Sequence, residues 1–250
     1  MSFSKCFLLF LSGFLISINQ ATSKELSLED VLSDIKSKVE NIESYRVEIE
    51  MVFNKPEVAS VVSSNISYVK PDKIKLIMGM KGKENTGQSM YSDGSEMWQY
   101  MPLFKIASKI DLLALKSEFK NTEELLSNQN NMEDITSNME EAEFTGLEEL
   151  NGEQVYVIEG LVKNNNASAL EGFGDIKTAK AFMSLEDGMQ RRMEYYDVDG
   201  ALLFYQAFNN IEINVSIPDE TFKFIVPEGI NILDITPQAR EMLKKSQLDE

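Results

Sequence analysis

Apolar residues recur at every second position over long stretches, and this period constrains the fold more than any other feature of the chain. The period is clearest in two segments, whose apolar positions are Val47, Ile49, Met51 and Phe53 in the first and Ile74, Leu76, Met78 and Met80 in the second. Successive side chains of a strand point to opposite sides, so this period is typical of a strand with one apolar face. The pattern predicts long, half-buried antiparallel strands.

Turn sequences separate further segments of the same kind. Pairs of Asp or Asn with Gly occur at 93–94, 151–152, 187–188 and 199–200, and such pairs favour tight hairpin turns. The predicted strands cover 44–54, 58–69, 73–80, 90–102, 143–150, 154–162, 177–185, 189–196 and 201–215. The residues between 80 and 90 are expected to form a polar connection. A sheet of so many strands must curl, because strand twist accumulates.

Two regions show a helical spacing instead. Residues 27–41 predict an amphipathic helix that begins with a capping box of Ser27 and Asp30. Between 103 and 138 the alternation stops, and Ile106, Ile110 and Leu113 follow the i, i+4, i+7 spacing of a helix. We therefore expect a helical insertion, with a second short helical stretch around 125–126, to cover the concave face of the sheet. Residues 238–250 are expected to form a charged tail, helical or frayed.

The N-terminus indicates export. Lys5 precedes an apolar run at 6–18 that is followed by small and polar residues. A charged start, an apolar core of about a dozen residues and a small-residue exit are typical of a secretory signal peptide, and the core is short for a membrane span. We expect cleavage after Ala21 or Ser23, which removes Cys6, the single cysteine. The predicted organisation is a signal peptide at 1–21, one domain at 22–237 and the tail at 238–250, in a bacterial periplasmic protein.

Composition excludes several kinds of chemistry. The chain has no histidine, and loss of Cys6 leaves no thiol, so histidine-based proton transfer, cysteine nucleophiles and most zinc or copper sites are excluded. A formal charge of −17 disfavours nucleic acid, whose phosphates require a basic face. We expect no catalytic residues, no metal and no cofactor.

Three motifs in this order resemble the LolA-type periplasmic lipoprotein carriers. Lys70-Pro71 precedes the alternating segment 73–80, and 93–102 reads D-G-x-x-x-W-x-Y-x-P. The segment 222–234 reads F-x-F-x-x-P-x-G-x-x-x-x-D, which is similar to the closing segment of that family. The resemblance implies an α+β fold that is mainly β, a long antiparallel sheet curled into an unclosed barrel. It also implies that the N-terminal helix and the inserted helical lid cover an apolar concave face.

The resemblance also implies where a ligand would lie. The residues expected to line an acyl-chain cavity are Val47, Ile49, Met51, Phe53, Ile74, Leu76, Met78, Met80 and Trp98. The sequence leaves open whether the side of Trp98 and Tyr100 or the side of Met97 and Met101 faces inward. Those expected on the lid are Ile106, Ile110, Leu113, Leu115 and Phe119. Flexible thioethers suit a surface that accepts varied lipids, although methionine also serves as ordinary core filler. Lys70 stands where the carriers often have an arginine that holds the lid, and a lysine would be the weaker latch because it lacks the bidentate fork.

Three functions are compatible with the sequence. The first is a monomeric carrier that moves the acyl chains of lipoproteins or lipids toward the outer membrane, with an inner-membrane releasing complex and an outer-membrane acceptor as partners implied by the resemblance. The second is a non-enzymatic sensor or regulatory binding protein on the same fold. The third, a hydrolase that uses two carboxylates, is the least favoured, because no aromatic subsite pattern accompanies the acidic residues.

Overall fold

The computed structural model describes residues 26–54, 62–119, 122, 135–163 and 175–246. Its helices are α1 (Leu28–Val39), α2 (Leu112–Glu118) and α4 (Thr236–Ser246), with short 3-10 turns η1 (Pro102–Phe104) and η3 (Asp219–Phe222). Its strands are β1 (Ser44–Phe53), β2 (Val62–Val69), β3 (Lys73–Met80), β4 (Lys83–Asp93), β5 (Glu96–Met101), β6 (Ile106–Asp111), β7 (Met139–Leu150), β8 (Glu153–Val162), β9 (Ile176–Ser184), β10 (Gln190–Asp197), β11 (Leu202–Ile213) and β12 (Asn231–Asp234). The signal peptide and the helical stretch expected at 125–126 lie outside the described residues.

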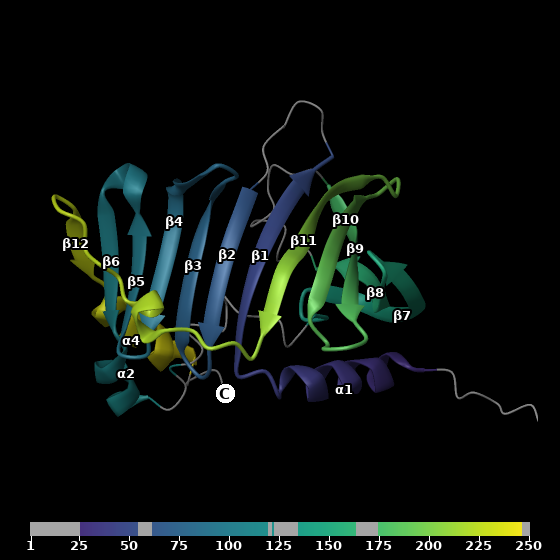
Figure 1. The fold of residues 1–250 in the computed structure, drawn as a ribbon, viewed down its shortest axis with the longest axis horizontal. Coiled ribbons are helices and arrows are strands. Elements are labelled where there is room, and N and C mark those ends of the chain that lie inside the picture. The colour runs from purple at the N-terminus through teal and green to yellow at the C-terminus, as the bar shows by residue number, and fades with distance from the viewer. Residues whose placement is uncertain (1–25, 55–61, 120–121, 123–134, 164–174, 247–250) are drawn as a thin grey trace, which may run out of the picture.

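All twelve strands form one sheet in the order β12-β6-β5-β4-β3-β2-β1-β11-β10-β9-β8-β7. Neighbours are antiparallel, except that β12 pairs with β6 in parallel. The sheet does not close into a barrel: β12 and β7 are its two free edges (Figure 1). The mainly β, unclosed architecture that the alternation and the resemblance predict is therefore confirmed.

One face of the sheet carries all three helices, and we call it the helix-covered face. At one end, Val31 and Ile35 of α1 pack against Tyr156 and Ile158 of β8 and against the small side chains of β9. At the other end, α2 and α4 pack on Ile110 of β6. Cross-strand pairs show that the two ends share this face. From Ile110 a row runs through Met97 and Ser92 to Ile74 of β3. Met80 lies on the same side of β3 as Ile74, and a second row runs from it through Val62 to Met51 of β1. The same row continues through Gln206 and Met193 to Ala181, beneath α1.

The start of α1 agrees with the sequence prediction. The Ser27 hydroxyl accepts a hydrogen bond from the Asp30 N–H, and the Asp30 carboxylate accepts one from the Ser27 N–H, which is a complete capping box. Two of the donors that a helix leaves unpaired at its N-terminus are satisfied in this way. The cap fixes where α1 begins, and therefore which of its residues face the sheet.

The opposite face is crossed by the segment that follows β11. Phe224 lies in this segment, and its ring centroid is 5.3 Å from those of Tyr91 and Trp98 and 5.4 Å from that of Tyr100. Phe222 is fully buried, in the turn η3 that packs on β3 and β4. The segment then turns and becomes β12 at the sheet edge. The two phenylalanines of the closing motif thus anchor the chain on the side away from the helices.

Two predictions of secondary structure are wrong. Residues 83–89, expected to form a polar link, are the first half of β4, and the turn lies at 81–82. Residues 106–111, expected to start the helical insertion, form β6, whose Ile106 and Ile110 pair with Met101 and Met97 of β5. Residues four apart share a face in a strand as well as in a helix, so the spacing of Ile106 and Ile110 fits both.

Candidate functional site

The residues predicted to line a cavity lie together, except for Trp98. Val47 and Leu76 both pair with Ile66 of β2, and Met51 and Met80 both pair with Val62. Residues that are directly paired across a ladder point to the same side of the sheet. The predicted positions of β1 and β3 therefore share the helix-covered face.

Trp98 lies on the face opposite to the other residues predicted to line a cavity. It pairs with Tyr91 and Lys109, and its indole N–H donates to the Glu96 carboxylate over 3.0 Å. Its ring packs against Phe224, and the Lys109 ammonium lies 5.5 Å from its centroid. Met97, the preceding residue, faces the helices and contacts their core. Trp98 therefore holds the closing segment in place.

Exposure changes along the helix-covered face from one end of the strands to the other. Val47, Ile74 and Leu76 are buried, with exposed fractions of 3%, 1% and 8%. Further along β3, Met78 and Met80 are 37% and 48% exposed. The residues predicted to line the cavity therefore divide into two sets. Val47, Ile74 and Leu76 belong to a buried core, and Met78 and Met80, further along β3, belong to a solvent-accessible group.

The accessible group lies on three adjacent strands of this face. The polar Ser64 of β2 pairs with both Ile49 and Met78 and lies between them. We call its apolar members the apolar strip. Met78 and Met80 are exposed, and the half-buried members are Ile49, Met51, Phe53 and Val62. The ring of Phe53 lies 5.8 Å from that of the buried Phe204, which in turn stacks on Tyr195 at 4.5 Å. Rigid aromatic packing thus supports the β1 side of the strip, whereas flexible methionines form the β3 side.

The predicted lid is only partly a helix, and its residues have different environments. Ile106 and Ile110 belong to a strand of the sheet. Leu115 and Phe119 are buried against Ala239 and Leu243 of α4, whereas Leu113 is 61% exposed. The described part of the insertion is therefore a short helix packed on α4. Ala239 and Leu243 lie in the segment 238–250, which was expected to form a helical or frayed tail.

Polar contacts fix α2 at both ends. The Leu112 N–H donates to the Ser95 carbonyl over 2.9 Å. Lys116 forms an ion pair with the buried Asp72 and donates to the Gly94 carbonyl over 2.8 Å. Arg240 of α4 donates to both carboxylate oxygens of Glu118, over 2.9 and 3.0 Å. Such bidentate pairs hold two elements in one relative geometry.

Among the described residues, the Lys70 side chain bonds the end of α1 and not α2, and its role as a lid latch stays a prediction. The Lys70 ammonium donates to the Glu40 carbonyl at the end of α1 over 2.8 Å. The turn that contains Lys70 contacts α2 through Asp72, two residues further along the chain, which forms the ion pair with Lys116. The Asp that follows Lys70-Pro71 in the sequence was the available signal for this contact.

We expect Lys116→Met to loosen α2 without unfolding the sheet. The change leaves the Asp72 carboxylate buried without its cationic partner, which costs about 1–3 kcal/mol. Hydrogen exchange of the amides at 112–119 should accelerate, while the amides of β1 and β3 keep their protection. The control is Lys244→Met, which removes an exposed ion pair within α4. Unchanged exchange at 112–119 would show that the apolar packing alone holds α2.

A second polar cluster attaches α1 to the sheet. The Tyr156 hydroxyl donates to the Asp34 carboxylate over 2.9 Å, and Lys38 forms an ion pair with the same carboxylate. Burial, together with the hydrogen bond to Asp34, raises the pKa of Tyr156 to about 12. Burial alone would raise the pKa of Asp34, but the bonds from Lys38 and Tyr156 outweigh it and lower that pKa below its ordinary value of 3.8. The cluster is structural, because its polar atoms are already paired with one another.

The contribution of this cluster to stability should depend on pH. The pKa of Asp34 is lower in the folded state than in the unfolded state. Ionised Asp34 therefore stabilises the protein fully at a pH above its unfolded-state pKa, and this stabilisation is lost as the pH falls through its folded-state pKa. Tyr156→Phe should cost about 1–2 kcal/mol at pH 7, and the difference from wild type should shrink below pH 4. Urea unfolding at several pH values measures this. Tyr195→Phe is the control: burial alone raises the pKa of Tyr195, and no carboxylate bonds its hydroxyl among the described residues, so its effect should be independent of pH over that range.

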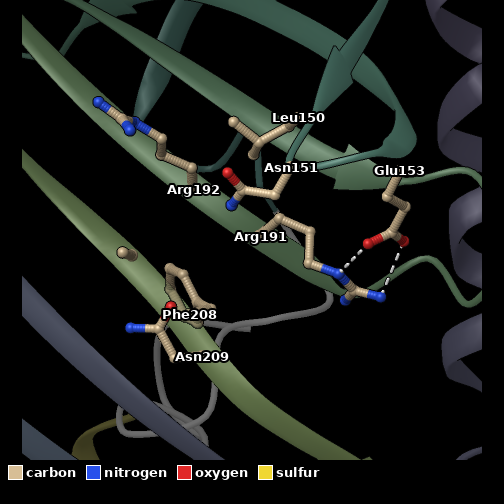
Figure 2. A pocket seen from close by; sticks show the side chains of 8 residues that line it. Leu150, Asn151, Glu153, Arg191, Arg192, Phe208 and Asn209 are labelled. Atoms are coloured by element: carbon tan, nitrogen blue, oxygen red, sulfur yellow. Dashed lines mark hydrogen bonds and ion pairs between the residues drawn. The ribbon is translucent and has the colours of Figure 1, made fainter.

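A small pocket lies between the β7–β8 turn and strands β10 and β11, and its charged lining residues are Glu153, Arg191 and Arg192. It has a volume of about 70 Å³, well below the 300–1,000 Å³ of typical small-molecule sites. Arg191 turns toward Glu153 and bonds both of its carboxylate oxygens over 2.8 and 2.9 Å, while Arg192 points away (Figure 2). Arg191 also bonds Asp187 over 2.7 Å. These pairs tie adjacent turns together, and the pocket does not match an acyl chain.

Two further observations concern the described residues as a whole. None of their helices combines the length and the hydrophobicity needed to cross a bilayer. Acidic side chains in this part of the chain do not gather in a group of three or more that could hold a metal ion.

A sequence model of predicted periplasmic proteins, DUF2092, matches residues 29–235. The chain belongs to this family. The family's description agrees with the periplasmic localisation predicted from the N-terminus. An uncharacterized protein of Methanocaldococcus jannaschii is 22% identical over 84% of this chain, which spans only 55% of that relative's length.

Solved structures resemble this DUF2092 member in fold. An uncharacterized conserved protein from Thermus thermophilus matches 82% of this chain and 98% of its own, with a TM-score of 0.53 and 8% identity. The lipoprotein LppX of Mycobacterium tuberculosis matches 77% of this chain and 99% of its own, with a TM-score of 0.45 and 13% identity. A LolA superfamily protein from Nitrosomonas europaea matches 80% of this chain and 99% of its own, with a TM-score of 0.35 and 12% identity.

Proposed function

We propose that this protein binds the acyl chains of lipoproteins or lipids on the apolar strip and carries them through the periplasm toward the outer membrane. The observation that carries the proposal is the exposure of Met78 and Met80 beside Met51 and Val62, on a face whose two ends are covered by helices. Large apolar side chains left accessible in a contiguous group mark binding surfaces.

The chemistry of the strip suits hydrocarbon. Its members offer aliphatic, thioether and aromatic surface, and binding an acyl chain requires no catalytic group. Burying hydrocarbon is worth about 0.8 kcal/mol per methylene, so an acyl chain of about a dozen carbons gains on the order of 10 kcal/mol before the costs of association are subtracted. Methionine side chains adapt to chains of different shape, which a carrier with more than one cargo needs.

Native mass spectrometry tests the proposal. Protein purified without detergent should carry co-purified lipid, or after delipidation should take up one equivalent of a triacylated lipopeptide. A deacylated form of the same peptide should not bind. Protein that carries no lipid after purification and does not bind the lipopeptide would overturn the proposal and favour a regulatory binding protein on the same fold.

A further inference from the structure

The two free edges of the sheet are built differently. At one edge, β7 carries five glutamates and has two shifts of register against β8. Charges and bulges of this kind prevent a free edge from pairing with other chains. At the other edge, β12 has the sequence Asn-Ile-Leu-Asp, is regularly paired with β6, and is exposed at all four positions. Only one of the two edges is thus protected against the addition of a strand.

The backbone of β12 presents unpaired groups to its outer side. Asn231 N–H donates to the Lys105 carbonyl over 2.8 Å, and Ile235 N–H donates to the Lys109 carbonyl over 2.9 Å. In a parallel pair, alternate residues bond to the neighbouring strand, so the N–H and C=O groups of Ile232 and Asp234 point away from β6. These groups form a ready edge for one more strand.

Apolar side chains surround this edge. Ile232 and Leu233, on opposite sides of β12, are 48% and 42% exposed, and Leu103 and Phe104 of η1 are 76% and 70% exposed. The turn η1 leads directly into β6, and the β5–β6 connection and the turn before β12 lie side by side at one corner of the sheet (Figure 1). Ile225, 86% exposed, follows the anchored Phe224 toward the same corner.

We propose that β12 is a docking edge for an extended segment of a different polypeptide, which adds to the sheet as a further strand. The free backbone groups select a polypeptide over a membrane, because hydrocarbon cannot satisfy the N–H and C=O groups of an open edge. The apolar side chains select aliphatic residues at alternate positions of the incoming strand. The length of β12 fits a segment of about four to six residues.

Charge decides between a different chain and a second copy. The protein carries a formal charge of −17, so two copies repel each other, whereas a neutral or basic segment does not. The docking edge also lies on β12, whereas the apolar strip lies on β1 to β3. The partner segment and the acyl chain therefore occupy separate sites, and one proposal can fail while the other holds.

The test uses a fluorescein-labelled peptide of alternating valine and threonine, flanked by lysines and blocked at both ends. Fluorescence anisotropy should show saturable binding to the full chain, and hydrogen exchange should slow at Ile232 and Asp234. Ile232→Pro should weaken binding at least about tenfold, because it removes an outward N–H and blocks the approach of a strand. Ile232→Thr keeps the N–H but loses apolar surface, so it should weaken binding less than Ile232→Pro, and both variants should melt like wild type.

Four outcomes would overturn the proposal. The first is a peptide that does not bind or that binds Ile232→Pro equally well. The second is equal binding of a glutamate-flanked peptide, which would remove the charge argument. The third is a concentration-dependent dimer in analytical ultracentrifugation that Ile232→Pro abolishes, which would assign the edge to a second copy. The fourth is binding to phosphatidylcholine vesicles that Leu103→Ser with Phe104→Ser abolishes, which would assign the corner to a membrane.

Discussion

Met78→Asp is expected to weaken binding of a triacylated lipopeptide strongly while leaving the protein folded. Met78 is 37% exposed, so an aspartate at this position stays hydrated in the empty protein and costs little stability. A bound acyl chain would cover the carboxylate and remove its water without offering a hydrogen bond. That desolvation should weaken binding by about 2–3 kcal/mol, roughly 30- to 150-fold.

A neighbouring position supplies the control for Met78→Asp. Ile77 precedes Met78 on β3 and points to the opposite face, where it pairs with Asn65. Ile77→Asp introduces the same charge on the same strand, and lipopeptide affinity should be unchanged. Isothermal titration gives the affinities and circular dichroism gives the melting temperatures. Equal losses in both variants, or full affinity in Met78→Asp, would show that acyl chains do not bind on the apolar strip.

The sequence predicts most of this sheet because its strands bury only one face. Where the period of two is unbroken, as in β1 and β3, it marks both the strand and the side that turns inward. The β3–β4 region was misread because the first half of β4 is polar and has no apolar face to show the period. Gly87, which belongs to that half, lies so close to β3 that a Cβ would meet the Met78 carbonyl at 1.7 Å. Its role is a backbone contact, which no pattern of apolar residues reveals.

The helical insertion shows a different limit of the sequence pattern. Ile106 and Ile110 satisfy a helical spacing, but they also satisfy a strand, and the decision depends on the available partner β5. The pairing of Lys116 with Asp72 joins residues 44 positions apart and has no periodic signal. The packing of α4 on α2 likewise depends on where the closing segment crosses the sheet. Contacts of this kind come from the tertiary structure and not from local preference.

The division of the cavity residues into a core and a strip was also beyond the sequence. Ile74 and Met78 lie on the same face of the same strand, and the period treats them alike. They differ because Ile74 packs against Leu76 and Met90, with Tyr68 and Met97 beside them, whereas Met78 lies beyond that cluster. Which end of the strand is covered depends on the positions of α1, α2 and α4.

Ile74→Asp is therefore expected to unfold the protein, in contrast to Met78→Asp. The isoleucine is 1% exposed, so the change removes a fully buried apolar side chain and places a carboxylate where no partner can reach it. The combined cost is about 4 kcal/mol or more, a large share of the 5–15 kcal/mol that stabilises a typical domain. Urea unfolding should show a large fall in the midpoint, or no folded baseline at all.

Ile74→Val separates the loss of packing from the effect of the charge. It deletes one methylene from the same cluster and should cost about 1 kcal/mol, with lipopeptide affinity retained. A pair of results in which Ile74→Asp folds normally but loses the lipopeptide would place Ile74 in the binding surface and move the boundary of the strip toward the helices. If Ile74→Asp unfolds the protein and Met78→Asp leaves it folded, the boundary lies between Leu76 and Met78. The boundary matters for function, because an acyl chain can contact only side chains that are already accessible in the folded protein. Side chains on the buried side of the boundary become accessible only when the protein unfolds.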